Sequence, residues 1–252
     1  MIRSLYTAVS GMVSLEAQQT AITSNLANIN TKGYKTEEVN LKSFEEVMLQ
    51  NKDNKNGEKR DIGGISLGVA IDGTYVRGKQ GIFNITDNTT DFAIDGEGYF
   101  VVNRNGEDFY TRDGKFRAST NGYLINGSGD SVMGENIQTG QLEPIYVGTD
   151  NFVMNSNNEL SVNGENATYK LATATFEEPV IKYGDGLYKG EDPDLDAKVY
   201  IAQGTLEDSN VNLVNEMANM LSVMRAFESN QKVIQTIDES LGKAASEIGS
   251  VR

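Results

Sequence analysis

Apolar residues recur at helical spacing near the C-terminus of the chain. Alternating steps of three and four residues connect a heptad series in which only Gln231 and Asp238 are polar. The series contains Met217, Met220, Met224, Phe227, Gln231, Ile234, Asp238, Leu241, Ala245 and Ile248. This pattern predicts one long amphipathic helix, which begins after the cap candidate Asn212 and continues to about Gly249.

The first thirty residues carry a matching series with Gln19 as its single polar member. It contains Leu5, Ala8, Met12, Leu15, Gln19, Ile22, Leu26 and Ile29. We expect a helix over residues 3 to about 30, which ends where Asn residues and Gly33 follow. An amphipathic helix that packs on its own domain would carry the same stripe. The matching stripe at the other end of the chain favours pairing of the two helices.

Between the helices the hydrophobic period changes to two. Residues 82–204 combine this alternation with frequent glycine, which predicts an antiparallel β domain. The expected strands are 92–95, 99–103, 109–112, 115–118, 122–126, 131–134, 145–148, 151–155, 159–163, 168–176, 180–182 and 198–202. The expected hairpin turns are Asp95-Gly96, Asn105-Gly106, Asp113-Gly114, Asn121-Gly122 and Asn126-Gly127.

Residues 35–81 show a weaker pattern. The apolar residues between Leu41 and Leu49 suggest a short helix, residues 51–61 a polar loop, and the alternation from Ile65 to Ile71 a strand. We interpret the whole stretch as an extended connector.

The predicted fold class is therefore α+β. We expect an N-terminal helix segment at 1–34, a connector at 35–81, a central antiparallel β-rich domain at 82–204 and a C-terminal helix segment at 205–252. The two long terminal helices are expected to pair as a coiled coil.

Composition narrows the function classes. The chain has 252 residues and a formal net charge of −14, which opposes binding to nucleic acid. It contains no Cys and no His, so the usual thiolate metal sites and the usual proton shuttle at neutral pH are missing. We predict no catalytic, cofactor-binding or metal site.

Two further observations concern location. No stretch approaches 18 uninterrupted apolar residues, so we expect no insertion into a membrane. The first residues do not have the pattern of a secretory signal peptide. We expect a protein that is either cytoplasmic or exported by a route without such a signal.

Residues 87–98 are rich in Asp and Gly, a composition that is also found in calcium-binding and phosphate-binding loops. They do not supply the ligand spacing of an EF-hand or the third glycine of a dinucleotide fingerprint. The pairs Asp87/Asp91 and Asp95/Glu97 are possible flanks of a glycosidic bond. We assign these residues to turns and to the surface.

Three blocks of sequence, in this order along the chain, resemble the flagellar rod and hook family of bacterial axial proteins. They are residues 5–12 with 25–35, residues 90–102 with 110–114, and residues 209–212 with 225–232. The motif residues are Asn25, Asn28, Thr31, Gly33, Tyr34, Asp95, Gly96, Gly98, Asp113, Gly114, Ser209 and Asn210. The chain is most similar to basal-body rod proteins of the FlgG and FlgF type, and it is short for a hook protein.

The resemblance implies a structural subunit of the flagellar basal-body rod in the cell envelope, and not an enzyme. Such a subunit is exported without a cleaved signal peptide by the flagellar type III apparatus. It polymerises through its terminal helices into a hollow drive shaft between motor and hook. The implied partners are copies of itself and other rod and hook proteins. The implied pairing surface is Leu5, Ala8, Met12, Leu15, Ile22, Leu26 and Ile29 against Met217, Met220, Met224, Phe227, Ile234, Leu241 and Ile248.

Two alternatives stay open at this point. Within the same family, the chain fits a hook or hook-junction axial protein. In another class, it fits a carbohydrate-active or carbohydrate-binding β-domain protein that uses carboxylates. A cleft with two converging carboxylates would favour the second alternative, and paired terminal helices favour the rod.

Overall fold

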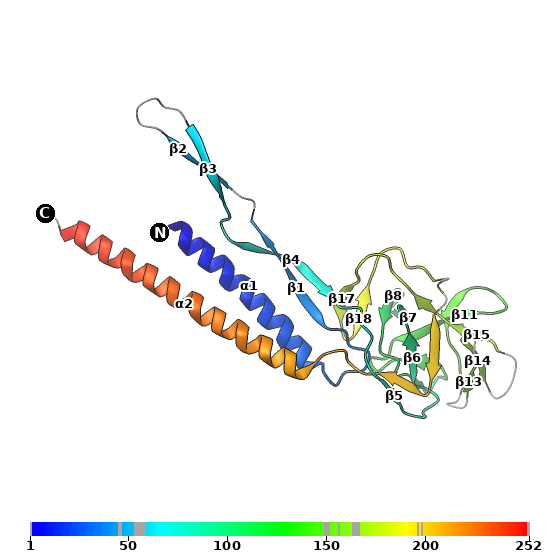
Figure 1. Cartoon of the computed structure of the whole chain (residues 1–252). Coiled ribbons are helices and arrows are strands. Elements are labelled where there is room, and N and C mark those ends of the chain that lie inside the picture. The colour runs from blue at the N-terminus through cyan, green and yellow to red at the C-terminus, as the bar shows by residue number, and fades with distance from the viewer. Residues whose placement is uncertain are drawn as a thin grey trace. The chain divides into compact units, whose positions relative to one another are not determined.

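The computed structural model describes residues 2–44, 47–52, 59–148, 152–155, 157–162, 167–195, 197 and 199–250. Its elements, in chain order, are α1 (Ile2–Ala27), β1 (Glu37–Ser43), β2 (Val47–Lys52), β3 (Lys59–Ile65), β4 (Val69–Val76), β5 (Phe83–Ile85), β6 (Phe92–Asp95), β7 (Tyr99–Arg104), β8 (Glu107–Thr111), β9 (Arg117–Ala118), β10 (Leu124–Ile125), β11 (Ser131–Asn136), β12 (Leu142–Pro144), β13 (Phe152–Met154), β14 (Glu159–Val162), β15 (Tyr169–Leu171), β16 (Thr173–Ala174), β17 (Ile181–Gly184), β18 (Leu187–Lys189), β19 (Tyr200–Gln203), β20 (Thr205–Glu207) and α2 (Leu213–Ser250). The predicted α+β class is confirmed (Figure 1).

The chain forms two compact units. The helical unit consists of Met1–Ser24, Glu38–Thr74 and Val214–Arg252, and the β unit consists of Asn25–Glu37 and Tyr75–Leu213. Much of the stretch that the sequence assigned to a connector therefore belongs to the same unit as the two helices.

In the helical unit, α1 and α2 lie side by side and run in opposite directions (Figure 1). Neither helix contains Pro, which would remove a backbone hydrogen bond from the helix interior. Glu216 lies in the first turn of α2, where its negative charge interacts favourably with the positive end of the helix dipole. No helix of the described residues is long and apolar enough to cross a membrane.

The short helix predicted between residues 41 and 49 is wrong, because β1 ends at Ser43 and β2 begins at Val47. Strand β1 pairs with β4, and β2 pairs antiparallel with β3. The predicted polar loop at 51–61 is also corrected: Asn51 pairs with Arg60 within this hairpin, and residues 53–58 lie outside the described residues. Strand pairing satisfies backbone groups whatever the polarity of the side chains, so polar sequence alone did not exclude a strand.

In the β unit, the largest sheet follows the path β13-β14-β15-β11-β7-β8-β18-β17, with β9, β10, β12 and β16 joined beside this path. The pairs along it are antiparallel, as predicted. Strands β6 and β19 form a separate pair, as do β5 and β20.

Strand β7 is buried on both faces. Phe100 and Val102 enter one apolar cluster of the core, and Val101 enters a second cluster. This arrangement explains the continuous apolar run in the sequence, because a strand covered on both sides does not need polar residues at alternate positions. The largest fully buried side chains of the first cluster are Phe92, Phe100, Phe152, Ile94, Leu124, Ile145, Leu160, Leu171 and Leu187.

The predicted strand at 92–95 coincides with β6, and most of the others are found with shifted ends. The strand predicted at 145–148 is an isolated bridge at Tyr146 that follows β12. Residue 198, where another predicted strand begins, lies outside the described residues. In this unit, strands β5, β12, β18 and β20 were missed.

The Asn105-Gly106 hairpin is confirmed, since both residues have positive φ and join the paired strands β7 and β8. The hairpin predicted at Asp95-Gly96 is wrong, because β6 pairs with β19 and not with β7. The hairpin predicted at Asp113-Gly114 is also wrong. A Cβ on Gly114 would lie 1.7 Å from the carbonyl oxygen of Phe92, so this glycine permits close backbone approach.

Candidate functional site: a helix pair and a buried junction

The two helices approach each other closely at Gly11 of α1. A Cβ on Gly11 would lie 3.1 Å from Nδ2 of Asn230 on α2. Since each helix rises about 1.5 Å per residue, this antiparallel register brings Ala21 level with Met220. Ala21 is buried and Met220 is partly covered. The side chain of Asn230 therefore fills space that Gly11 leaves open.

The covered side of α2 follows alternating steps of three and four residues. It consists of Met220, Val223, Phe227, Asn230, Ile234, Ile237, Leu241 and Ala244. We call these eight residues the covered lane. Half of them coincide with the series predicted from the sequence, whereas the other half lie one residue earlier than predicted. This shift brings Ile237 into the lane in place of Asp238 and leaves Met224 outside it.

The structure of one chain places the predicted pairing residues at different depths. On α1 and the following turn, Ala8 and Ile22 are buried, and Leu5, Met12, Leu15, Leu26 and Ile29 are partly covered. On α2, Met220, Phe227, Ile234 and Leu241 are partly covered, and Met217 and Met224 are 52% and 44% exposed. The side chain of Ile248 lies outside the described residues.

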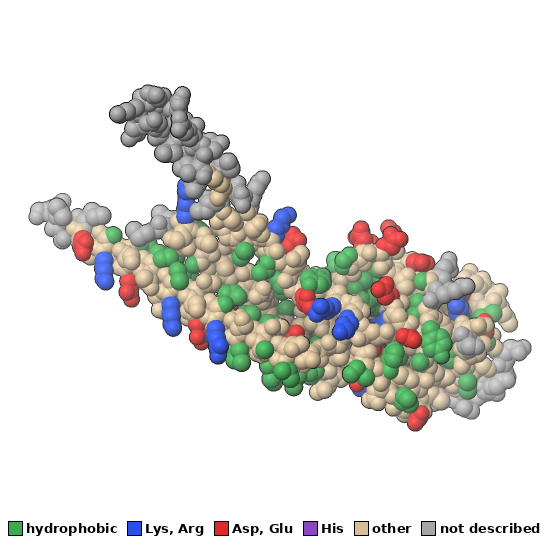
Figure 2. Space-filling model, in the orientation of Figure 1, with side chains coloured by type: hydrophobic (Ala, Val, Ile, Leu, Met, Phe, Trp, Pro, Cys, Tyr) green, Lys and Arg blue, Asp and Glu red, His purple; other side chains and the backbone are tan. Residues whose placement is uncertain are grey.

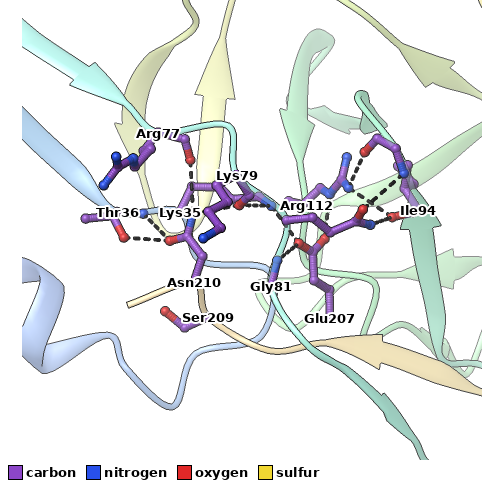
Figure 3. A network of polar contacts seen from close by, with 12 residues as sticks. Lys35, Thr36, Arg77, Lys79, Gly81, Ile94, Arg112, Glu207, Ser209 and Asn210 are labelled. Atoms are coloured by element: carbon purple, nitrogen blue, oxygen red, sulfur yellow. Dashed lines mark hydrogen bonds and ion pairs between the residues drawn. The ribbon is translucent and has the colours of Figure 1, made fainter. Parts of the chain in front are cut away.

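A second feature lies in the β unit, where Arg112 follows the end of β8. Its Nε donates to Oε2 of Glu207 at 2.7 Å, and its Nη2 donates to the carbonyl oxygens of Ile94 at 2.9 Å and Gly96 at 2.6 Å. Nη1 donates to the carbonyl oxygen of Gly98. The guanidinium thus uses its planar fork of donors inside the protein, as Figure 3 shows.

Glu207, at the end of β20, collects donors from three segments of the chain. Its Oε1 accepts from Nζ of Lys35 at 2.6 Å and from the backbone N–H of Gly81 at 2.7 Å, in addition to the bond from Arg112. The side chains of Lys35 and Arg112 are each 3% exposed, and that of Glu207 is 1% exposed. The three residues form a buried ion triad.

Burial by itself raises the pKa of Glu207, but the charges of Arg112 and Lys35 and their hydrogen bonds outweigh it. The pKa of this carboxyl is therefore lowered from its ordinary value. Lys35 also donates to the carbonyl oxygen of Lys79 at 3.1 Å. The carboxylate is held ionised between two cations.

Asn210 connects the segment before α2 to two other segments. Its Oδ1 accepts from the backbone N–H and the hydroxyl of Thr36 at 2.7 and 2.6 Å. Its Nδ2 donates to the carbonyl oxygens of Arg77 at 3.0 Å and Lys79 at 2.7 Å (Figure 3). All four hydrogen bonds of Asn210 go to backbone groups or to a hydroxyl group. A shorter or apolar side chain at this position would not make these bonds.

Asn25 plays a similar part at the end of α1. It is buried, and its Oδ1 accepts from the hydroxyl of Tyr34 at 3.1 Å and from the backbone N–H of Glu37 at 2.9 Å. Its Nδ2 donates to the carbonyl oxygen of Glu37 at 3.0 Å. Lys182 of β17 lies 4.6 Å from the centre of the Tyr34 ring, a cation over an aromatic face.

Gly33 is required by both conformation and space. Its φ is +66°, and a Cβ would lie 2.3 Å from the carbonyl carbon and oxygen of Arg112. Its backbone N–H donates to the carbonyl oxygen of Glu207 at 2.8 Å. The turn after α1 therefore lies directly against the ion triad.

The structure brings the three motif blocks together in the β unit. Gly33 and Lys35 come from the first block, the carbonyl groups of Gly96 and Gly98 and the side chain of Arg112 from the second, and Asn210 from the third. Three further motif residues serve local turns. Thr31 donates to Asn28, Asp113 accepts from the backbone N–H of Lys115, and Ser209 accepts from that of Val211. Asp95 is exposed.

The sequence did not single out Lys35, Arg112 or Glu207. Lys35 and Arg112 lie within the quoted blocks, and Glu207 lies just before the third block. The one available signal was that these charged residues lie within or next to blocks that resemble the family. Their mutual pairing had no signal, since Lys35 and Glu207 are 172 residues apart.

A cleft of about 260 Å³ in the β unit borders the triad. Its wall includes Glu97, Glu177 and Glu178, together with Lys35 and Arg112. The two cations are engaged with Glu207 and with carbonyl groups, as described above. Within the described residues, no group of three acidic side chains is placed to hold a metal ion.

Three family descriptions match separate parts of the chain. Residues 5–35 match a family described as flagella basal body rod protein, residues 93–164 match the flagellar hook protein FlgE/F/G D1 domain, and residues 202–247 match the flagellar basal body rod FlgEFG protein C-terminal family. Lys35, Arg112 and Glu207 each fall in a different one of these matches.

Individual relatives are similar from end to end. The flagellar basal-body rod protein FlgG of Bacillus subtilis is 31% identical over 264 residues, which cover 96% of this chain and 97% of that protein. The flagellar hook-basal body complex protein FlhO of Bacillus subtilis and the flagellar basal-body rod protein FlgF of Caulobacter vibrioides are each 30% identical, over 100% of both chains. The chain belongs to the flagellar basal-body rod protein family.

Proposed function

We propose that this chain is a structural subunit of the flagellar basal-body rod, located in the cell envelope, and that it polymerises through its terminal helices into the hollow shaft between motor and hook. The observation that carries the proposal is similarity over the full length of both chains to relatives named as rod proteins. In this role the protein has no catalytic step, and its partners are copies of itself, other rod and hook proteins and the flagellar type III export apparatus.

Within each subunit, α1 and α2 pair as an antiparallel coiled coil. Support comes from the covered lane on α2, whose steps of three and four residues are those of a heptad seam, and from the close approach of Gly11 to Asn230. The residues predicted from the sequence then fall into two groups. Phe227, Ile234 and Leu241 serve the pair within one chain, and Met217 and Met224 serve contacts with another chain.

The buried junction holds the chain segments that lead to the two helices together. It fixes the turn after α1 and the segment before α2 inside the β unit through Glu207 and Asn210. A subunit of a shaft that transmits torque needs its chain segments fixed within each unit, because a loose segment would absorb rotation. We assign this positioning role to the triad and to Asn210.

Assembly of purified protein tests the proposal. Leu15→Asp and Met224→Asp each place a charge in an apolar contact, so we expect both variants to stay unassembled in sedimentation and electron microscopy. Ser222→Asp, on an exposed position of the same helix, is the matched control and is expected to assemble. Near-ultraviolet circular dichroism of the tyrosines verifies that the β unit stays folded. Normal assembly of the Leu15 and Met224 variants would contradict the helix assignment.

A second experiment tests the location. Antibodies against the chain, applied to isolated basal bodies, are expected to label the rod. Labelling of the hook, or of no part of the basal body, would contradict the rod assignment. The position of the label along the rod also separates a proximal from a distal subunit.

A further inference from the structure

The first turns of α2 carry a second apolar stripe outside the covered lane. It consists of Val214, Met217, Leu221 and Met224, which follow steps of three, four and three residues and are 74, 52, 57 and 44% exposed. At 100° per residue these four side chains share one side of the helix, next to the covered lane. Figure 2 shows apolar side chains gathered at the beginning of α2, whereas charged side chains follow one another along its later part.

An apolar groove lies elsewhere in the same unit. It is lined by Tyr6, Val9 and Ser10 of α1, by Phe44 and by Leu67. The loop around Gly68 is held against α1 by hydrogen bonds, from the hydroxyl of Thr7 to the carbonyl oxygen of Leu67 at 3.2 Å and from the backbone N–H of Val69 to the hydroxyl of Ser10 at 3.4 Å. The groove is therefore formed by fixed elements, and Tyr6, Val9 and Phe44 remain exposed in it.

Charge favours contact between these two surfaces. Copies of a chain with a net charge of −14 repel one another, so they associate best where charge is absent. Residues 4–15 contain no charged residue, and residues 209–224 contain only Glu216, which is partly covered. The groove and the stripe lie within these two stretches, apart from Phe44 and Leu67.

The two surfaces cannot meet within one chain. The register set by Gly11 and Asn230 brings Val9 level with Lys232, whereas Leu221 is level with Thr20. The groove and the stripe are thus displaced along the helix pair by roughly 16 Å, at about 1.5 Å per residue. A contact between two different surfaces on identical copies is heterologous, and it builds an open filament unless the rotation between copies closes a ring.

We propose that the stripe Val214, Met217, Leu221 and Met224 of one copy docks in the groove lined by Tyr6, Val9, Phe44 and Leu67 of the next copy. This inference rests on the proposed function and specifies the contact between subunits. Each helical unit inserts its stripe into one neighbouring copy and receives the stripe of another copy in its groove. In this contact, α2 of one chain packs beside α1 of the neighbouring chain, and the two chains are displaced from each other along the helix axis.

Cysteine cross-linking tests the contact, because the chain contains no Cys of its own. Leu221→Cys and Tyr6→Cys are prepared as separate single variants, assembled alone or mixed, and treated with a mild oxidant. We expect dimers linked by a disulfide in the mixture only. Gln235→Cys, exposed and further along α2, is the matched control and is expected to give no dimer with Tyr6→Cys.

The outcomes separate the inference from the proposed function. Dimers from Leu221→Cys alone would indicate contact between two identical stripes and overturn the proposal. Filaments without dimers in the mixture would overturn the proposal and leave the rod function standing. Failure of the unaltered chain to assemble under conditions in which a related rod protein assembles would contradict the rod function, and the docking contact with it.

Exchange of charge provides a second measurement. Leu221→Glu is expected to lower the assembled fraction by roughly tenfold, because it buries an unpaired carboxylate in the groove. Ser222→Glu is the control and is expected to leave the assembled fraction unchanged. The double variant Leu221→Glu with Val9→Lys is expected to recover assembly, since each carboxylate then meets an ammonium of the next copy. No recovery would show that these two positions do not face each other.

Discussion

Nζ of Lys35 lies 2.6 Å from Oε1 of Glu207, between side chains that are almost completely buried and 172 residues apart in the chain. With Arg112 on the other oxygen, Glu207 neutralises two cations that have been removed from water. The net stabilisation that a buried ion pair provides is small. Removal of one partner costs much more free energy of unfolding, because it leaves buried charges without a partner.

Replacement of this carboxylate should therefore destabilise the β unit strongly. We expect Glu207→Gln to lower the free energy of unfolding by about 3 to 5 kcal/mol. Asp208→Asn is the matched control, because Asp208 pairs with Lys32 at a partly exposed position and should cost less than about 1 kcal/mol. Denaturant unfolding followed by tyrosine fluorescence measures both, since the chain has no Trp. Equal losses in the two variants would contradict the role of the triad.

The same carboxyl predicts a dependence of stability on pH. The pKa of Glu207 is lowered in the folded protein, so the unfolded state binds more protons in the acidic range. Its stabilising contribution is fully present above the ordinary pKa of 4.5 and is lost as the pH falls through the lowered folded value. The difference in unfolding free energy between the parent chain and Glu207→Gln should therefore shrink below about pH 4.5. A difference that stays constant down to acid unfolding would contradict this prediction.

A third prediction concerns Gly33. Both Gly33 and Gly106 have positive φ, but a Cβ on Gly106 would meet nothing within 4 Å, whereas one on Gly33 would meet the backbone of Arg112. Each alanine substitution should cost about 1 to 2 kcal/mol for the left-handed conformation. Gly33→Ala should cost about 1 to 3 kcal/mol more than Gly106→Ala, because the backbone must shift. Thermal unfolding of the two variants, compared side by side, gives the difference.

A fourth prediction tests the register of the helix pair within one chain. A double variant with Gly11→Cys and Asn230→Cys should react with a short bismaleimide to give a species linked within the chain, which migrates faster in a denaturing gel. The control combines Gly11→Cys with Met217→Cys, which the antiparallel register separates by roughly 20 Å along the axis. An intrachain link in the control and none in the test variant would show that the register is wrong.

The periodicity of α2 predicted its existence and half of its covered lane. The count began at Met217 and therefore placed Met224, Gln231 and Asp238 in the seam. Packing against α1 instead uses Asn230, since Gly11 leaves space for a larger polar side chain there. A helix with two neighbouring apolar stripes does not reveal from its sequence which stripe faces its own chain. The starting residue of the count decided the prediction, and packing against the facing helix decided which residues are covered.

The sequence predicted the antiparallel sheet of the β unit, but it did not predict which strands pair with each other. Asp113-Gly114 has the composition of a hairpin turn, yet Gly114 is needed because the backbone of Phe92 passes close to it. The triad was beyond prediction for a related reason. A charged residue such as Arg112 is usually exposed, and sequence spacing carries no information about a partner such as Glu207, which lies 95 residues away.

The hydrogen bonds of the junction also join the chain segments at the border of the β unit to one another. Thr36 bonds to Arg77 and to Asn210, and Asn210 bonds to Arg77 and Lys79. These residues lie on the three stretches that lead from the β unit to the rest of the chain, 25–37, 75–81 and 204–213. A force applied to any one of these stretches is consequently divided among all three, and bonds that carry a load in parallel fail together at a higher force than bonds that open one after another.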